Sequence, residues 1–384
     1  MEVYFDNSAT TRCYDSVKDI VVKAMTEDFG NPSAMHLKGV EAEKYIKSSA
    51  ESLARLLKVQ EKEILFTSGG TESDNLALIG ATLANKRSGN HIITTSVEHP
   101  AVSQPALFLQ EQGFEVTYLP VDSRGVVKMD ALKAVLREDT ILVSVMYVNN
   151  EVGAVEPIEE ISRIIKAKNP SVIFHVDAIQ AYGKYVIRPK KQGIDLLSVS
   201  GHKIHGPKGV GFLYIRSGVK IKPLIYGGGQ QNNLRSGTEN VPGAAGLGVA
   251  AKEMYTDHEE KIRRLTELKD YMIDRLGEIE GTLVNSKKGT ESAPQIVSVS
   301  FEGVRSEVLL HALEDKEIYV SSGSACSSHH PGISGTLKGI GLAQKYLDAT
   351  IRISFGIFNT KEEIDYCIDT LKELLPVLRR YQRG

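Results

Sequence analysis

Short β-branched and aromatic runs alternate with longer amphipathic segments between about residues 60 and 215. The runs are EILFT (63–67), HIITT (91–95), EVTYL (115–119), ILVSV (141–145), VIFHV (172–176), DLLSV (195–199) and GFLYI (211–215). This alternation is typical of βαβ units, in which successive strands lie parallel. Because runs such as ILVSV are apolar on both faces, we expect helices to cover them on each side. The sequence therefore predicts an α/β fold, with a large three-layer domain around a mostly parallel sheet of about seven strands.

The pattern changes after residue 240. Residues 241–280 predict one long helical stretch, which can link two domains. The segments beyond it are IVSVSF (296–301), SEVLLHALED (306–315), IYVSSG (318–323), TIRISF (350–355) and a closing helix at 361–381. A chain of 384 residues exceeds the size at which one hydrophobic core usually stops growing. We predict a large domain at 15–255 and a smaller α+β domain formed by 1–14 and 256–384.

Composition and charge argue against several classes of protein. The net charge is −2 and the basic residues are dispersed, so direct recognition of nucleic acid is not expected. No apolar run approaches the roughly 20 residues of a membrane span, and the N-terminus lacks the basic and apolar regions of a signal peptide. Three cysteines without a CxxC or a His-spaced partner argue against disulfides and a metal site. We expect a cytoplasmic protein that does not bind a membrane.

A glycine-rich segment, SGGTES (68–73), follows the first predicted strand. It opens a helix, where free backbone N–H groups and the helix dipole favour a phosphate, and Thr71 can add a hydroxyl. An alternative is an ordinary helix start closed by a capping box from Thr71 to Asp74. The sequence alone leaves both interpretations open.

Two further strands end in groups that suit pyridoxal phosphate. The polar residues that follow VIFHV and DLLSV are Asp177, Gln180, Ser200, His202 and Lys203. The cofactor needs a lysine that bonds to it covalently, an acid that keeps its ring nitrogen protonated, and a phosphate cradle. Asp177 and Lys203 are about one helical crossover apart, so both are expected at the same edge of the sheet. Lys208 is the competing lysine, but it lies further into the loop.

The chain resembles a known family nearly from end to end. The matching motifs are YFDNSATT (4–11), FGNPSAMH (29–36), TSGGTESDNLA (67–77), EHPAV (98–102), NNEVGAV (149–155), HVDAIQ (175–180), SGHKIHGPKG (200–209), RSGTEN (235–240), SSGSACSS (321–328) and IRISFG (351–356). They are similar to those of the cysteine desulfurases of the iron-sulfur assembly type, in the class V aminotransferase group of fold-type I pyridoxal phosphate enzymes. The resemblance implies pyridoxal 5'-phosphate as cofactor, L-cysteine as substrate, and a homodimer with active sites at the subunit interface.

The resemblance also implies roles for residues that match the family's motifs. His99 would stack on the cofactor ring and take part in proton transfer, which suits an imidazole near neutrality. Asn150 and Gln180 would contact the phenolic oxygen of the cofactor and the substrate side of its ring. The neighbouring Asn149 is expected to point to the opposite face. The residues expected to hold the phosphate are Gly70, Thr71, Ser200, His202 and, from the other subunit, Thr238.

Arg352, in the predicted strand TIRISF, would by resemblance hold the α-carboxylate of the substrate. A guanidinium matches a carboxylate because it offers two parallel donors. Ile351 and Ile353 would point to one face of the strand and Arg352 to the other. Alternation alone does not say which face meets solvent.

Cys326 lies among small residues in SSGSACSS, where it has nothing to pack against. The resemblance implies that its thiol takes the sulfur of cysteine as a persulfide and passes it to an acceptor, such as an iron-sulfur scaffold protein or another thiol. His329 and His330 follow closely, either as activating groups or as solvated loop residues. Cys367 lies in an amphipathic helix, where a free cysteine acts as a small hydrophobe, and Cys13 has no activating neighbour.

Three rival functions remain open from the sequence. A class V aminotransferase acting on another amino acid would share Lys203, Asp177 and the phosphate loop but would not need Cys326. Selenocysteine lyase activity is a second alternative on the same scaffold. The third is a non-enzymatic binding or scaffold protein that has kept the fold and lost the chemistry.

Overall fold

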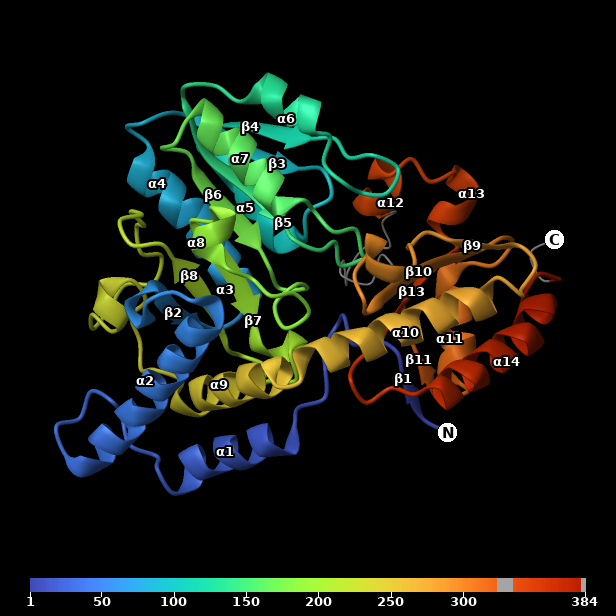
Figure 1. The fold of residues 1–384 in the computed structure, drawn as a ribbon, viewed down its shortest axis with the longest axis horizontal. Coiled ribbons are helices and arrows are strands. Elements are labelled where there is room, and N and C mark those ends of the chain that lie inside the picture. Colours follow the sequence, from blue (N-terminus) through green and yellow to red (C-terminus); the bar gives the residue numbers. More distant parts are fainter. Residues whose placement is uncertain (323–333, 381–384) are drawn as a thin grey trace.

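The computed structural model describes residues 1–322 and 334–380, and its ribbon is drawn in Figure 1. The predictions for Cys326, His329 and His330 lie outside these described residues. Within them the chain forms a seven-stranded sheet, a four-stranded sheet and a separate pair of short strands.

The seven-stranded sheet confirms the predicted α/β architecture. Its strands follow the order β2-β8-β7-β6-β5-β3-β4, and all neighbours are parallel except the two that pair with β8. Its strands are β2 (Ile64–Thr67), β3 (His91–Thr95), β4 (Glu115–Leu119), β5 (Thr140–Met146), β6 (Ile173–Asp177), β7 (Leu196–Ser200) and β8 (Gly211–Ile215). Each corresponds to one of the seven predicted runs.

Helices cover both faces of this sheet, as the doubly apolar strands predict. Successive residues of a strand enter different cores: Leu142 packs with the core that contains α4 and α5, whereas Val143 packs with the core that contains α7 and α9. The helices of this part are α1 (Asp15–Thr26), α2 (Leu37–Leu57), α3 (Gly70–Asn75), α4 (Ala81–Asn85), α5 (Pro100–Glu111), α6 (Met129–Val135), α7 (Ile158–Lys168), α8 (Pro189–Gln192) and α9 (Val241–Tyr255). A π-helix, Leu76–Gly80, joins α3 to α4.

The prediction of one long helical stretch at 241–280 is wrong in one respect, because the segment forms two helices. Helix α9 ends at Tyr255, and α10 (His258–Leu276) begins after Asp257, which adopts a left-handed conformation with φ 49°. The two helices pack in different hydrophobic cores: Leu247 of α9 packs in the core of the large sheet, and Leu268 of α10 packs in the C-terminal core. Figure 1 shows α9 and α10 running end to end between these two parts. The break supports our proposal that the chain divides near residue 255.

The C-terminal part is built on an antiparallel sheet with the order β12-β13-β10-β9. Its elements are β9 (Thr282–Val284), β10 (Ile296–Phe301), α11 (Ser306–Glu314), β11 (Ile318–Tyr319), β12 (Ser321–Ser322), α12 (Gly335–Gly339), α13 (Gln344–Leu347), β13 (Thr350–Ser354) and α14 (Lys361–Leu378). The segment IYVSSG, predicted as one strand, forms two. Tyr319 of β11 pairs with Tyr4 of β1 (Val3–Tyr4), whereas Ser321 of β12 pairs with Arg352 of β13. The partner therefore changes within three residues.

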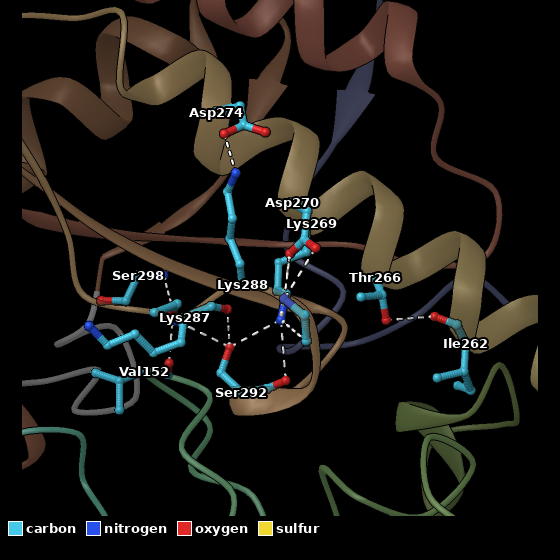
Figure 2. A network of polar contacts seen from close by, with 12 residues as sticks. Val152, Ile262, Thr266, Lys269, Asp270, Asp274, Lys287, Lys288, Ser292 and Ser298 are labelled. Carbon is cyan, nitrogen blue, oxygen red and sulfur yellow. Dashed lines mark hydrogen bonds and ion pairs between the residues drawn. The ribbon is translucent and has the colours of Figure 1, made fainter.

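A buried lysine on α10 fixes a loop of the C-terminal part. Lys269 is 0% exposed, and its Nζ donates hydrogen bonds to the carbonyl oxygens of Gly289 (2.7 Å) and Ser292 (3.2 Å) (Figure 2). The same loop reaches the large part, because the hydroxyl of Ser286 donates a 2.8 Å bond to the carbonyl of Val152. Lys269 thus stabilises the surface against which the loop after β5 packs.

Two features are absent from the described residues, a membrane-spanning helix and a cluster of metal ligands. No helix within 1–322 and 334–380 is both long enough and apolar enough to cross a membrane. In the same ranges, no group of three or more His, Cys, Asp or Glu side chains is placed to hold a metal ion.

Candidate active site

A cavity of about 330 Å³ lies at the carboxyl ends of β5, β6 and β7. It collects ten of the residues predicted from the sequence, although they come from distant parts of the chain. These are Gly70, Thr71, His99, Asn150, Asp177, Gln180, Ser200, His202, Lys203 and Arg352. The parallel strands explain the convergence, since their carboxyl ends meet at one edge of the sheet.

Lys203 lies in a short 3₁₀ turn, Gly201–Lys203, directly after β7. Its Nζ donates hydrogen bonds to the carbonyl oxygen of Ala9, at 2.7 Å, and to that of Ser8. The main-chain carbonyl of Lys203 accepts a 2.6 Å bond from Nζ of Lys184. The competing Lys208 is exposed and lines a neighbouring cavity, not this one. The structure therefore brings Lys203 to the cavity.

Asp177 is the last residue of β6 and is 5% exposed. Its Oδ1 accepts a 2.9 Å bond from the backbone N–H of Ile179. Burial raises the pKa of Asp177 to about 6, while this hydrogen bond and the charge of Lys203 oppose the shift. The site therefore contains a buried acid with a positive group nearby.

The glycine-rich turn before α3 forms one end of the cavity. A Cβ at Gly70 would lie 2.1 Å from Cδ1 of Ile179, so a side chain there would require Ile179 to move. The predicted alternative, a capping box from Thr71 to Asp74, is wrong. The residue that caps α3 is Gly69, with φ 148° and no side-chain bond, and Asp74 is fully buried. Thr71 is left exposed at the cavity.

His99 caps the N-terminus of α5. Its Nδ1 accepts a 3.1 Å bond from the backbone N–H of Ala101, so the neutral ring carries its proton on Nε2. Burial, together with the charges of Lys203 and Arg352, lowers the pKa of His99 to about 4. The imidazole is therefore neutral at physiological pH.

Arg352 faces the cavity and not solvent, which answers the question that alternation left open. Ile351 and Ile353 are fully buried in the C-terminal core, and Arg352 points the other way. Its Nη1 donates a 2.9 Å bond to the carbonyl of Asn150, and its Nη2 donates a 2.8 Å bond to Oδ1 of Asp6. The strand pattern and the loop after β5 together fix this guanidinium.

An N-terminal segment completes the cavity wall and was missed as a functional element. Ser8 and Ala9 line the cavity, and the hydroxyl oxygen Oγ1 of Thr10 lies 3.2 Å from Nδ1 of His202. The carbonyl of Ser8 also accepts a 3.0 Å bond from Nε2 of Gln180. The motif YFDNSATT contains these residues, but between β1 and α1 the segment has only an isolated bridge at Asp6 and turns. The segment therefore has no hydrophobic periodicity from which its place in the cavity wall could be predicted.

Other predicted residues lie elsewhere. Asn149 turns away from the cavity, as expected, and donates from its side chain to the carbonyl of Val97 at 3.1 Å. Thr238 is exposed and does not line the cavity of its own chain. Cys367 is fully buried in a core, which raises its pKa to about 12 and confirms its packing role. Cys13 donates its thiol to the carbonyl of Gly206 at 3.1 Å.

Comparison with known proteins agrees with this geometry. The chain matches the family model described as "Aminotransferase class-V" over residues 3–367. A chain from Methanosarcina thermophila named "Cysteine desulfurase IscS" is 46% identical over 98% of this chain and 93% of its own length. A chain of the same name from Dictyoglomus turgidum is 44% identical over 98% of this chain and 95% of its own.

Solved structures show the same likeness. A structure described as "NIFS-LIKE PROTEIN" matches with a TM-score of 0.93 at 40% identity, over 98% of this chain and 100% of that one. A second, "SspA in complex with cysteine", matches with a TM-score of 0.81 at 34% identity, over 94% and 100%.

The three-layer fold and the cavity that joins a lysine to a buried aspartate define an enzyme of the pyridoxal phosphate-dependent type. The chain belongs to the class V aminotransferase family. Its cofactor is pyridoxal 5'-phosphate, as in that family. The donor set fits this group, because the cavity offers an amine, a buried acid and the glycine turn at the start of α3.

Proposed function

We propose that this protein is a cysteine desulfurase. It removes sulfur from L-cysteine, releases L-alanine and leaves a persulfide on Cys326. The observation that carries the proposal is that one cavity brings together the amine of Lys203, the acid of Asp177 and the guanidinium of Arg352. The relatives named as cysteine desulfurases support the same activity over an aminotransferase or a lyase of selenocysteine.

Different residues of the cavity hold different parts of the cofactor in this proposal. When bound, pyridoxal phosphate supplies an electron sink for negative charge at the substrate Cα. Lys203 would bond to it covalently, and the carboxylate of Asp177 would keep its ring nitrogen protonated. Asn150 and Gln180 would contact its phenolic oxygen and the substrate side of its ring. The phosphate ligands are Gly70, Thr71, Ser200, His202 and Thr238 of the second subunit.

His99 and Lys203 move protons in this proposal. The amine of Lys203 would accept the Cα proton. His99 is neutral and carries its proton on Nε2, so it can donate there and orient the bound ring. Both groups line the same cavity as Arg352, which holds the α-carboxylate through two N–H donors.

The thiolate of Cys326 attacks the sulfur of the bound substrate. A sulfur–sulfur bond forms as the carbon–sulfur bond of cysteine breaks, and the carbon skeleton leaves as alanine after protonation. Cys326 is suited to this because its neighbours in the sequence, Ala325 and Ser327, are small. The persulfide then passes to an acceptor protein, for which an iron-sulfur scaffold is our proposal, in the cytoplasm.

We further propose a homodimer, because Thr238 is placed outside the cavity of its own chain. Large apolar side chains are exposed around the start of α2 and the preceding loop, where Phe29, Met35 and Leu37 are 68%, 101% and 82% exposed. An exposed apolar patch of this kind marks an interaction surface. In Figure 1 this region projects at the end of the molecule opposite the C-terminal sheet.

The decisive experiment compares Cys326→Ser with Cys13→Ser. We expect the first variant to bind the cofactor, seen as yellow colour that borohydride bleaches, but to release no alanine from L-cysteine. The second should release alanine at the wild-type rate, because Cys13 lies outside the cavity. Release of alanine at an unchanged rate by Cys326→Ser would contradict the proposal.

A further inference from the structure

Arg352 already has a carboxylate partner within its own chain. Its Nη2 lies 2.8 Å from Oδ1 of Asp6, and the side chains are 6% and 21% exposed. On the other side, Nη1 donates to the carbonyl of Asn150 at 2.9 Å. Asp6 therefore supplies a full negative charge to a buried guanidinium, which is expensive to bury without a counter-ion.

The carboxylate of Asp6 is the same chemical group as the α-carboxylate of an amino acid. A single guanidinium cannot neutralise two carboxylates, and an unpaired charge in a buried site is costly. His99, the N-cap of α5, lines the same cavity but is neutral. The other cation that lines the cavity, Lys203, already donates to the carbonyl oxygens of Ser8 and Ala9. A substrate carboxylate and Asp6 must therefore compete for Arg352.

The two partners differ in their freedom to move. Arg352 is held by strand β13, which pairs with β10 on one side and β12 on the other. Asp6 lies beyond β1, and its main-chain carbonyl accepts from the N–H of Ala9 at 2.9 Å. Its backbone can stay in place while its side chain turns to the solvent that it already meets. The aspartate is therefore the partner that can leave.

We infer that Asp6 is the resident counter-ion of Arg352 and is exchanged for the α-carboxylate of the amino-acid substrate. This inference rests on the role given to Arg352 under the proposed function. It makes Asp6 a specificity-determining residue, because a ligand gains the guanidinium only by displacing an anion already bound there. Weak anions such as chloride are excluded, and a carboxylate anchored by its own amino group is accepted.

The test uses the wild-type holoenzyme and Asp6→Asn, which is isosteric and keeps the backbone contacts. Each is titrated with L-alanine and with L-alaninamide, which lacks the carboxylate, and the cofactor absorbance is followed. We expect the dissociation constant for L-alanine to fall on the order of tenfold in Asp6→Asn, because the competing charge is gone. The constant for L-alaninamide should not fall, and added chloride should weaken L-alanine binding more in the variant than in wild type.

A matched control is Asp122→Asn, which removes a carboxylate paired with Arg124 at the surface. It should leave both constants unchanged. An unchanged or higher constant for L-alanine in folded Asp6→Asn would overturn the inference. If that variant does not fold, a crystal structure of the wild type with L-alanine decides: Asp6 still bonded to Arg352 would overturn it equally.

The outcomes separate the two proposals. If wild type binds L-alanine but makes no alanine from L-cysteine, the proposed function fails and the titration still tests Asp6. If wild type makes alanine and Asp6→Asn binds L-alanine no more tightly, only the inference fails. If wild type does not respond to L-alanine at all, the inference is overturned, and the release of alanine from L-cysteine still tests the proposed function.

Discussion

Nζ of Lys184 donates a 2.6 Å hydrogen bond to the main-chain carbonyl of Lys203. Lys184 is only 8% exposed, and burial, followed by the charge of Lys203, lowers its pKa to about 7. This carbonyl belongs to the turn that carries Lys203 into the cavity. A buried amine thus stabilises the position of a second amine.

The first prediction concerns the pH dependence of this contact. Because the pKa of Lys184 lies below its ordinary value of 10.5, the unfolded chain binds more protons than the folded chain between pH 7 and 10. The free energy of unfolding of wild type should therefore rise, relative to that of Lys184→Met, by about 1–3 kcal/mol from pH 7 to pH 9. Urea denaturation at both pH values measures it. If wild type and Lys184→Met differ in free energy of unfolding by the same amount at both pH values, the lowered pKa of Lys184 is contradicted.

The second prediction is that Asp177 destabilises the fold when the cofactor is removed. Its pKa is raised from 3.8 to about 6, so the folded chain binds more protons in that window and loses stability as pH rises through it. At pH 8, cofactor-free Asp177→Asn should be more stable than cofactor-free wild type by about 1–3 kcal/mol. At pH 4 the difference in stability between the two cofactor-free proteins should be smaller. With pyridoxal phosphate present, the variant should bind it more weakly, as equilibrium dialysis would show.

The third prediction tests Arg352 as the carboxylate ligand. In Arg352→Lys, one ammonium replaces two parallel donors, so the KM for L-cysteine should rise on the order of ten- to a hundredfold. The cofactor content, measured after borohydride reduction, should stay at the wild-type level. Arg124→Lys is the control, since Arg124 pairs with Asp122 at the surface. Equal KM values for the two variants would argue against a role in substrate binding.

The fourth prediction separates a buried from an exposed lysine in the same network (Figure 2). Lys269→Met should lower the free energy of unfolding by about 2–4 kcal/mol, because one buried and one partly buried carbonyl lose their donor. Lys288→Met removes an exposed ion pair with Asp274 and should cost less than about 1 kcal/mol. Urea denaturation of both variants measures the contrast. A Lys269→Met variant as stable as wild type would show that packing replaces the polar contacts.

The sequence by itself determined the seven strands of the large sheet and much of the site. Each of the seven runs in 60–215 is a strand, and Asp177 and Lys203 lie at neighbouring strand ends because parallel strands joined by crossovers bring those ends together. Local periodicity was sufficient to predict these strands, since a strand that is apolar on both faces is expected to be buried on both faces.

Only the tertiary structure decided which face of β13 carries Arg352, where the helix after residue 240 breaks, and that Asp6 pairs with Arg352. Each of these depends on a partner far away in the chain. Alternation says that Arg352 and Ile351 point apart, but the core that buries Ile351 is built from α10, α14 and β10. The contact between Asp6 and Arg352 joins residues at opposite ends of the sequence. No local pattern encodes it, because its energy comes from burial that exists only once the chain has folded.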